Sequence, residues 1–346
     1  MTCVRWLRPN DPAWLKYLAD VPHDIYHLPG YVETAAQSDD GEPWGLLINQ
    51  QDASMFIPLL VRKLPAALSI DGWRDATTPY GYPTPLIQSP DDTTTQQLLI
   101  ALKNTLRECH IVSLFCRLHP LLPWPQVSLR KVGRLVQQGQ TVYIDLQRSL
   151  SEITAKIRKG YRYDVRKLKQ NGFWAQACSW DDISYFRSMY YQTMTRIGAK
   201  NYYFFDDTYF DNLKNALGSA LFLWLVFSPE HEPIAAGLFS HYQNIVQYHL
   251  SGTDERYVSQ APNKLMLLEV MHWAHAQGAA YMHFGGGLSG REDSLFHFKA
   301  GFSKQRADFF TYRLIAAPQA YDTLCTRWQE QHQVPLDEMF FPAYRK

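Results

Sequence analysis

Residues 281–303 read YMHFGGGLSGREDSLFHFKAGFS, an apolar stretch typical of the end of a buried strand followed at once by three glycines. Glycine lacks Cβ, so it adopts backbone angles that other residues avoid and lets another group approach closely. A polar loop to Asp293 then leads into a predicted short helix that carries Phe298 and Lys299. This order predicts a tight corner at Gly285 and Gly286, over which the Lys299 side chain reaches back.

The length and composition of the chain predict a soluble, well-packed protein. With 346 residues, 46% of them hydrophobic and 19% charged, it can bury a sizeable core in about two domains. Its net charge of +1 does not steer the whole protein to nucleic acid or an anionic membrane, and DNA is not an expected partner. Five scattered cysteines, without a CxxC pair, favour a reducing compartment over a disulfide framework or a zinc ribbon.

No targeting or membrane segment is expected. The N-terminal residues carry charges throughout, unlike a signal peptide, and the longest apolar run covers only residues 220–227. A membrane-spanning helix needs about 20 apolar residues. We therefore expect a cytoplasmic protein without a transmembrane segment.

The first half mixes helix and strand patterns without a regular βαβ series. Apolar residues at helical spacing predict helices at residues 11–18, 32–38 and 93–109. Apolar or alternating runs predict strands at residues 44–49, 53–61, 111–118, 129–136 and 140–146. Prolines and glycines in residues 71–86 predict an irregular, rigid loop. There Tyr80 and Tyr82 flank Gly81, and the loop is either a structural turn or a substrate-facing surface.

A strongly basic helix is predicted from residue 149. Ser149 and Glu152 form a capping box, and Gly172 is the expected stop. The helix has an apolar stripe made of Ile153, Ile157, Tyr161, Val165 and Leu168. Off the stripe, and apart from the capping Glu152, it has one acid, Asp164, and a run of cations: Lys156, Arg158, Lys159, Arg162, Arg166, Lys167 and Lys169.

The one-signed charge of this helix leaves two interpretations. A solvated helix usually carries acidic partners one turn away from its cations, and they are missing here. The functional interpretation is a surface for the phosphates of a nucleotide, a lipid pyrophosphate or an RNA, with Arg158, Lys159 and Arg162 as candidate contacts. The alternative is a solvated face.

The second half predicts a longer series of elements. Helices are expected at residues 181–198, 207–217 and 262–277, and three antiparallel strands at residues 221–227, 234–241 and 245–251. The strand, glycine corner and short helix of residues 281–303 follow. A strand at residues 309–315 and a helix at residues 318–330 close the chain.

Several motifs of this chain resemble the FemAB family, the tRNA-dependent aminoacyltransferases of peptidoglycan bridges, with relatives among GNAT-type proteins. They are YHLSGT at residues 248–253, PNKLMLLE at 262–269, YMHFGG at 281–286 and FKAGF at 298–302. The stretch IRKGYRYDVR at residues 157–166 and the loop TPYGYPTP at 78–85 are also similar to that family. The resemblance is best between residues 149 and 315.

The resemblance implies a mixed α/β (α+β) fold of two tandem GNAT-like domains, with mostly antiparallel sheets flanked by helices. It places the domains at residues 1–147 and 148–346, with the active-site corner in the second. It implies transfer of an acyl or aminoacyl group to an amine. Lys299 and Phe298 inherit an active-site role, Tyr248 matches an active-site tyrosine, and Arg196 resembles a substrate-binding arginine.

Two departures from the family pattern keep the donor open. The family commonly has Asp before Phe-Gly-Gly, where this chain has His283, and a coiled-coil insertion that contacts tRNA in some members is absent. The expected co-substrate is therefore aminoacyl-tRNA, acyl-CoA or the thioester of an acyl carrier protein. No tightly bound cofactor is expected. The expected acceptor is a small or lipid-linked amine, such as a cell-envelope precursor or an amino sugar.

The chemistry of such a transfer selects further candidates. A tetrahedral oxyanion needs a preorganised donor, which the Lys299 ammonium would supply near the glycines. His283 and His297 are candidate bases by position, and Tyr248 is one by resemblance; a histidine in a core strand is more often simply hydrogen-bonded. No nucleophile elbow is present. His272 and His275 lie one helical turn apart but do not form an HExxH motif, so no metal site is expected.

Three functions follow. The first is an acyltransferase or aminoacyltransferase acting on an envelope precursor or amino sugar. The second is an N-acyltransferase that makes a small metabolite from acyl-CoA or an acyl carrier. The third is a non-catalytic protein that binds RNA or an anionic lipid head group and retains the fold. A binding protein has no need of the Phe298–Lys299 corner, which argues against the third.

Overall fold

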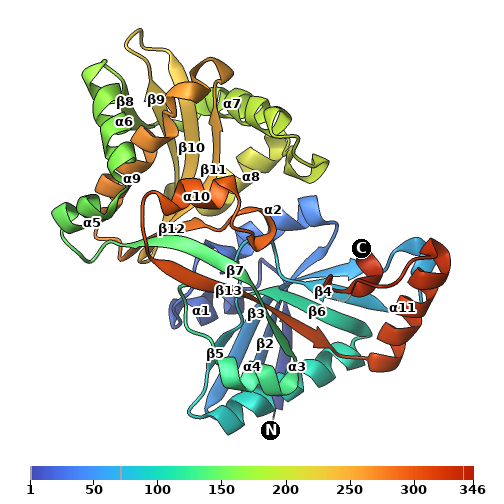
Figure 1. The fold of residues 1–346 in the computed structure, drawn as a ribbon. Helices are drawn as coiled ribbons and strands as arrows, with labels where there is room; N and C mark the ends of the chain where they lie inside the picture. Colours follow the sequence, from blue (N-terminus) through green and yellow to red (C-terminus); the bar gives the residue numbers. More distant parts are fainter. Residues whose placement is uncertain (1, 71, 338) are drawn as a thin grey trace. The chain divides into compact units, whose positions relative to one another are not determined.

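The computed structural model describes residues 2–70, 72–337 and 339–346 and divides into two compact units (Figure 1). Unit 1 comprises Met1–Gln138 with Phe309–Lys346, and unit 2 comprises Gly139–Asp308. This division differs from the one expected at residue 147, because the C-terminal segment packs with unit 1. There Leu324 and Trp328 are buried with Leu64 and Val112 in one apolar cluster.

Unit 1 is built on a mixed sheet. In spatial order its strands are β1 (Thr2–Leu7), β2 (Glu42–Gln50), β3 (Ala53–Lys63), β4 (Arg74–Thr77), β6 (Ile111–Arg117) and the second half of β13 (Arg306–Ile315), with β5 (Leu86–Gln88) pairing with β3. Among the strand pairs of unit 1 within the described residues, only β4 and β6 are parallel. Residues that alternate along β2 and β3 therefore fill two apolar layers, one on each face.

Helices cover both faces of that sheet. The elements are α1 (Pro12–Ala19), α2 (Pro29–Asp39), α3 (Asp92–Glu108), α4 (Gln126–Val132) and α11 (Pro318–His332). Leu98 and Leu102 of α3 pack on Leu46 and Ile48, whereas Trp14 of α1 packs with Phe56 on the other face. Asp11 caps α1 by accepting from the Ala13 amide, as its position before Pro12 predicts.

Unit 2 has its own mixed sheet. Its order is β7 (Arg134–Asp145), β12 (Tyr281–Gly285), β11 (Ile245–Thr253), β10 (Pro233–Tyr242), β9 (Leu221–Phe227) and β8 (Trp174–Cys178). The three predicted antiparallel strands, β9 to β11, are confirmed. β11 and β12 are parallel and pair over only three residues, ending at Gln247 opposite His283.

Two groups of helices flank the sheet of unit 2 (Figure 1). One face carries α5 (Leu150–Lys156), α6 (Lys159–Gln170), α9 (Asn263–Ala276) and α10 (Ser294–Ala300), and the other carries α7 (Ile183–Arg196) and α8 (Asp207–Leu217). The apolar stripe predicted for the basic helix is buried in the core of the first group. None of the helices within the described ranges is both long and apolar enough to cross a membrane.

Several sequence predictions of local structure are wrong. The helix predicted from Ser149 is two helices, because Ile157 and Arg158 are extended and the Arg158 amide bonds the Gly301 carbonyl at 2.8 Å. The strand predicted at residues 129–136 is α4 followed by one long β7, since Leu129 faces the core of α3. The loop predicted at residues 71–86, whose first residue lies outside the described ranges, contains β4, because its prolines begin only at Pro79. β8 was not predicted.

Candidate active site

Lys299 reaches back over the glycine corner, as predicted. Its Nζ donates a hydrogen bond of 2.6 Å to the carbonyl of Gly286. Gly285 has a φ of +74°, which glycine adopts without strain. A Cβ on Gly287 would lie 2.0 Å from the Arg291 carbonyl oxygen, so the loop that follows closes on itself. The glycines are therefore needed for this turn.

Asp293 fixes the loop to the helix that carries Lys299. As N-cap of α10, its carboxylate accepts from the Phe296 amide at 2.9 Å and from the Leu288 amide at 2.8 Å. These backbone hydrogen bonds outweigh its partial burial and lower the pKa of Asp293. The Lys299 side chain is thus held between its own capped helix and the glycine turn.

Burial changes the chemistry of Lys299. The residue is only 8% exposed. Desolvation lowers the pKa of its amine to about 8, and the nearby Asp293 carboxylate opposes that shift. At neutral pH the amine is still charged, but its pKa is close to the working pH of a cell. Such an ammonium is able both to donate to a developing oxyanion and to give up its proton.

Tyr161 packs against the helix of Lys299 from behind. Its hydroxyl donates to the Phe298 carbonyl at 3.1 Å, and its ring lies 5.2 Å from that of Phe302. A Cβ on Gly301 would lie 2.2 Å from the Tyr161 ring, so the end of α10 rests directly on that ring. Together with the Arg158–Gly301 bond, these contacts fasten the start of α6 to α10.

Tyr248 belongs to the same apolar core. Its ring stacks on Phe239 at 5.3 Å and lies 6.3 Å from Phe284, the residue that precedes the glycines. Its hydroxyl shares a short hydrogen bond with Ser251. Burial raises the pKa of Tyr248 to about 12. The phenol therefore stays protonated at neutral pH, so it suits hydrogen-bond donation better than the role of a base.

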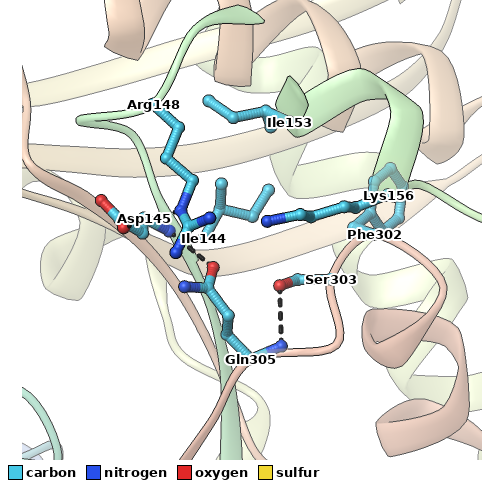
Figure 2. Close-up of a pocket in the computed structure, with 8 residues that line it drawn as sticks. All are labelled: Ile144, Asp145, Arg148, Ile153, Lys156, Phe302, Ser303 and Gln305. Carbon is cyan, nitrogen blue, oxygen red and sulfur yellow. Dashed lines mark hydrogen bonds and ion pairs between the residues drawn. The ribbon is translucent and has the colours of Figure 1, made fainter. Parts of the chain in front are cut away.

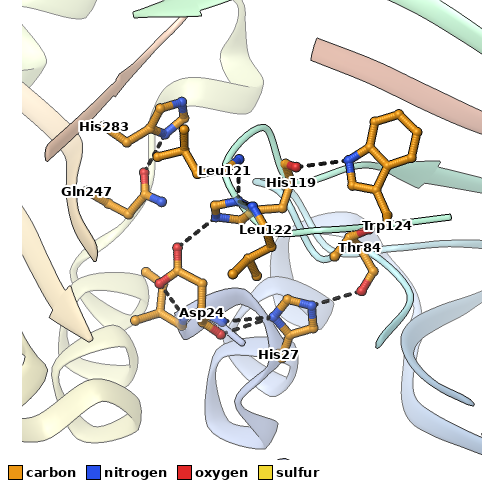
Figure 3. A network of polar contacts seen from close by, with 10 residues as sticks. Asp24, His27, Thr84, His119, Leu121, Leu122, Trp124, Gln247 and His283 are labelled. Carbon is orange, nitrogen blue, oxygen red and sulfur yellow. Dashed lines mark hydrogen bonds and ion pairs between the residues drawn. The ribbon is translucent and has the colours of Figure 1, made fainter. Parts of the chain in front are cut away.

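His283 lies on the other face of β12. Met282 and Phe284 on either side of it are in the core with α9 and α10, so the alternation of the strand directs His283 away from that core. Its Nδ1 is 2.7 Å from the Oε1 of Gln247, as Figure 3 shows. His297 is exposed on α10. The structure thus brings neither histidine onto the face of Tyr248 and Phe284.

The basic residues form an outward row on α6. Arg158, Lys159 and Arg162 are all exposed, and Tyr163 among them is 64% exposed. The two charges beside α9 are neutralised: Asp164 pairs with Lys264 at 2.6 Å, and Lys169 pairs with Glu269 at 2.5 Å. The charge left over therefore points away from the protein.

Arg196 lies at the end of α7. It is exposed, and its guanidinium donates to the Thr253 carbonyl at the end of β11 at 3.3 Å. The last turn of α7 thus meets the last residue of the strand that carries Tyr248. The structure gives no direct contact between Arg196 and Lys299.

A small separate pocket lies in unit 2 behind α5 (Figure 2). Ile144, Ile153 and Phe302 form its apolar side, and Figure 2 shows the charged ends of Arg148 and Lys156 directed into the same space. Asp145 accepts from Arg148 at 3.2 Å and so neutralises part of that charge. None of the predicted site residues lines this pocket.

The predicted tyrosines of unit 1 have different surroundings. Tyr80 is 41% exposed, with the Arg117 guanidinium 5.0 Å from its ring. Tyr82 packs edge-on against Tyr26 at 5.7 Å. Gly81 has a φ of +103°, and a Cβ there would lie 2.2 Å from the Tyr26 ring. Of the pair, Tyr80 is the one presented to solvent.

A buried polar network holds this loop of unit 1 (Figure 3). His119 donates through Nε2 to Asp24 at 3.0 Å, and its Nδ1 accepts from the amides of Leu121 and Leu122. His27 donates through Nε2 to the Thr84 carbonyl at 2.9 Å, and burial lowers the pKa of His27 to about 4. Both ring nitrogens of His119 are hydrogen-bonded within the protein, so the His119–Asp24 pair stabilises the fold and is not suited to proton transfer.

Sequence reasoning missed three residues near the corner. Asp293 has a local signal, an acid three residues before an apolar helical residue. Tyr161 was assigned to an apolar stripe, and its contact with Gly301 has no local signal. His249 follows Tyr248 at a bulge of β11, and only the pairing register with β10 reveals it. Among the described residues, no three His, Cys, Asp or Glu side chains gather to hold a metal ion.

The order of these elements has a counterpart among known proteins. Residues 155–299 match the family described as acetyltransferase (GNAT) domain. The chain carries a GNAT domain. No curated protein sequence matches the chain.

Solved structures extend the likeness to both units. The crystal structure of FemX is 14% identical, covers 92% of this chain and 99% of its own, and has a TM-score of 0.70. L-PGS from Bacillus licheniformis is 13% identical, with coverages of 88% and 92% and a TM-score of 0.54. A tandem GNAT protein from the clavulanic acid biosynthesis pathway is 10% identical, with coverages of 92% and 99% and a TM-score of 0.51. The predicted tandem GNAT-like fold is confirmed.

Within the GNAT domain, the glycine corner and the residues that pack around it come from consecutive elements of the chain. β11 carries Tyr248, α9 carries Lys264, β12 ends at the glycines, and α10 carries Lys299 back to them. The Lys264 amine lies 4.4 Å from the centre of the Tyr161 ring, which links α9 to the same cluster.

Proposed function

We propose that this protein is an acyltransferase that moves an acyl or aminoacyl group from an activated ester or thioester to an amine, and that its GNAT domain carries the reaction. The observation that carries this proposal is Lys299, a buried cation held on the Gly286 carbonyl. Burying a charge disfavours folding, so a cation in this position suggests a use in chemistry. A non-catalytic binding protein would not need it.

The reaction that suits this corner is aminolysis. The amine attacks the acyl carbon and creates an oxyanion, whose charge needs a donor already in place. The Lys299 ammonium serves that oxyanion and then protonates the leaving oxygen or sulfur. The Tyr248 hydroxyl, protonated at neutral pH, is a second donor on the neighbouring strand. Phe298 and the glycines Gly285 and Gly286 shape the turn on which these groups stand.

The donor we favour is an aminoacyl-tRNA. From Lys159 to Arg166 the cationic row of α6 extends for roughly 10 Å at the rise of an α-helix. That length exceeds what one pyrophosphate group occupies and suits a repeating phosphate backbone. The likeness of fold to FemX is consistent with this choice. Arg158, Lys159 and Arg162 are the donor contacts in this proposal.

The acceptor we favour is an amine of a cell-envelope precursor or an amino sugar. Arg196 and Tyr80, both exposed, are candidate contacts for its anionic and ring parts, with Tyr82 supporting the Tyr80 loop. Both proposed substrates place the reaction in the cytoplasm.

A second candidate is an N-acyltransferase that takes its acyl group from acyl-CoA or an acyl carrier protein. The observation that favours it is the absence of a coiled coil: the longest helix of the described chain, α3, has only 17 residues. CoA also presents phosphates that a cationic row would bind.

Unit 1 is the weaker candidate for the transfer. Its parallel strands β4 and β6 stay bonded beyond the end of β4, because the Thr78 amide donates to the Phe115 carbonyl at 2.9 Å and the Arg117 amide donates to the Thr78 hydroxyl at 3.3 Å. In unit 2 the parallel pairing stops after three residues. This contrast supports assigning the donor to unit 2.

A thermal-shift panel followed by a transfer assay tests the proposal. The purified protein is heated with acetyl-CoA, a long-chain acyl-CoA, a UDP-linked muropeptide or bulk aminoacyl-tRNA, since a ligand of the native state raises the melting temperature. Pairs that include a shifting donor are then assayed for transfer of a radiolabelled acyl group. A shift with aminoacyl-tRNA supports the first candidate, and one with a CoA thioester supports the second. A shift of the melting temperature without transfer of the acyl group would indicate a non-catalytic binding protein.

A further inference from the structure

His249 occupies an irregular position in β11. Phe239 of β10 pairs with Tyr248 and Leu238 pairs with Leu250, so His249 is an extra residue that faces no partner on β10. A bulge of this kind redirects a side chain and is common beside active sites. The regular pattern of the strand therefore does not account for this histidine.

The bulge lies where β11 separates from β12. The last pair between these strands is Gln247 with His283, two residues before His249. Tyr248, which lies between Gln247 and His249, has its ring 6.3 Å from that of Phe284, and Gly286, whose carbonyl accepts from Lys299, follows Phe284 by two residues. His249 is thus on the strand next to the glycine corner, at the point where that strand loses its parallel neighbour.

The Nε2 atom of His249 is buried and has no hydrogen-bond partner among the residues that the structure describes. Buried polar atoms are nearly always paired, because an unmade hydrogen bond costs folding free energy. Two buried histidines of unit 1, His27 and His119, have both ring nitrogens within hydrogen-bond distance of a partner. Burial lowers the pKa of His249 to about 4, so its ring is neutral at pH 7.

We propose that His249 is a further catalytic residue of this protein, whose Nε2 takes the proton of the attacking amine. The assignment rests on the proposed acyl transfer. An unpaired, neutral ring nitrogen on the strand next to the glycine corner is an acceptor for an N–H group. The same nitrogen has no visible role in folding, which separates it from the structural histidines of unit 1.

The steps balance with Lys299 as the acid. The amine nitrogen bonds to the acyl carbon, the carbonyl electron pair moves to oxygen, and one amine proton passes to Nε2 of His249. When the oxyanion collapses, the bond to the leaving oxygen or sulfur breaks and the Lys299 ammonium protonates the leaving group. The proton on His249 then returns to Lys299 through solvent, which restores both residues.

A stability measurement tests the first half of the inference without any substrate. His249→Leu removes the nitrogen and keeps an apolar side chain in its place. Because no bond to the protein is lost, we expect the melting temperature to equal or exceed that of the wild type. A fall of several degrees would mean that Nε2 has a structural partner, and it would overturn the proposal.

Kinetics test the second half. The assay uses the pair of the panel above that the wild type turns over, with acetyl-CoA, the long-chain acyl-CoA or aminoacyl-tRNA as donor and the UDP-linked muropeptide as acceptor. With that pair, His249→Leu and His249→Gln should lower kcat by about 10²-fold or more. The KM of the donor should stay within about twofold, because a proton acceptor acts after binding. Glutamine keeps a hydrogen bond but takes no proton, so it should not rescue kcat.

His272→Gln on the surface of α9 is the matched control and should keep wild-type rates. A His249→Leu variant with wild-type kcat would overturn the role of His249 while leaving the proposed function standing. If the wild type turns over no pair of the panel, both the transfer and this role of His249 are refuted. A rise in KM alone would make His249 a binding residue and would equally overturn the assignment.

Discussion

Replacing Lys299 by methionine separates the folding role of this side chain from its chemical role. In the folded chain its pKa is about 8, against an ordinary value of 10.5. The difference corresponds to about 3 kcal/mol by which burial disfavours the charged lysine. The bond to Gly286 offsets part of this, since a hydrogen bond from a charged donor contributes about 1.5–3 kcal/mol. At pH 7 we therefore expect Lys299→Met to be as stable as the wild type, or up to about 2 kcal/mol more stable.

The pH dependence has a defined sign. Below pH 8 the lysine is protonated in both states, so the folded state bears the full cost of its charge. Between pH 8 and 10.5 the folded lysine loses its proton while the unfolded one keeps it, and the wild type gains stability. The advantage of the methionine variant should therefore be largest below pH 8 and should vanish by about pH 10. Urea denaturation at pH 7 and pH 10 measures both values.

The same variant should lose nearly all of its activity. Removing one preorganised donor to an oxyanion costs about 10²–10³ in kcat. The readout is transfer of a radiolabelled acyl group with the donor that shifts the melting temperature. Lys304→Met, an exposed lysine five residues further on, is the matched control and should keep both stability and rate. A destabilised Lys299→Met, or one that retains wild-type kcat, would refute the reasoning.

Three further outcomes are expected. Gly301→Ala should lower the free energy of unfolding, measured in urea, by about 1–3 kcal/mol, because its Cβ would lie 2.2 Å from the Tyr161 ring. The control Gly160→Ala, whose Cβ would meet nothing within 4 Å, should not lose stability. Equal stabilities of the two variants would contradict the packing of α10 on α6. Replacing the outward α6 cations Arg158, Lys159 and Arg162 by glutamine should weaken polyanion binding and reduce the slope of log K against log salt concentration by about 2–3. The same replacement of three exposed cations of unit 1 should change neither quantity; this control set is Arg107, Arg130 and Lys131. An unchanged slope in the α6 variant would make the row a solvated face. His119→Leu should cost about 3 kcal/mol or more, since it removes the buried partner of Asp24 and the acceptor of two backbone amides; a loss below about 1 kcal/mol in urea would show that the network is dispensable.

The sequence predicted the corner of the GNAT domain well because its signals are local. Three glycines after an apolar strand, and one lysine a short helix later, were enough to expect Lys299 over Gly286. The capping box of Ser149 and Glu152 is likewise local, and the structure contains both of its bonds. Alternation along β12 was a further local signal that the prediction did not use: it places the His283 side chain on the other face of the strand from Met282 and Phe284.

Features that depend on distant partners escaped the sequence. No sequence pattern near Arg158 predicts that its amide donates to the Gly301 carbonyl, so one helix was predicted where two exist. The bulge at His249 is a matter of register with β10, and register is set by the whole sheet rather than by the strand alone. The roles assigned to Arg196, Tyr80 and Tyr82 depend on a substrate, and they stay predictions.

The two flanks of α6 and its outer row are under different structural constraints. Asp164 and Lys169 are committed to α9 through Lys264 and Glu269, and the inner stripe is buried. The outer residues Lys159, Tyr163 and Arg166 are exposed, where substitutions usually change stability by no more than about 0.5 kcal/mol. Mutation can therefore change the charge of this face with little effect on folding. Under the donor role proposed for this face, relatives with the same scaffold can diverge in the carrier they accept while keeping Lys299 and its corner intact.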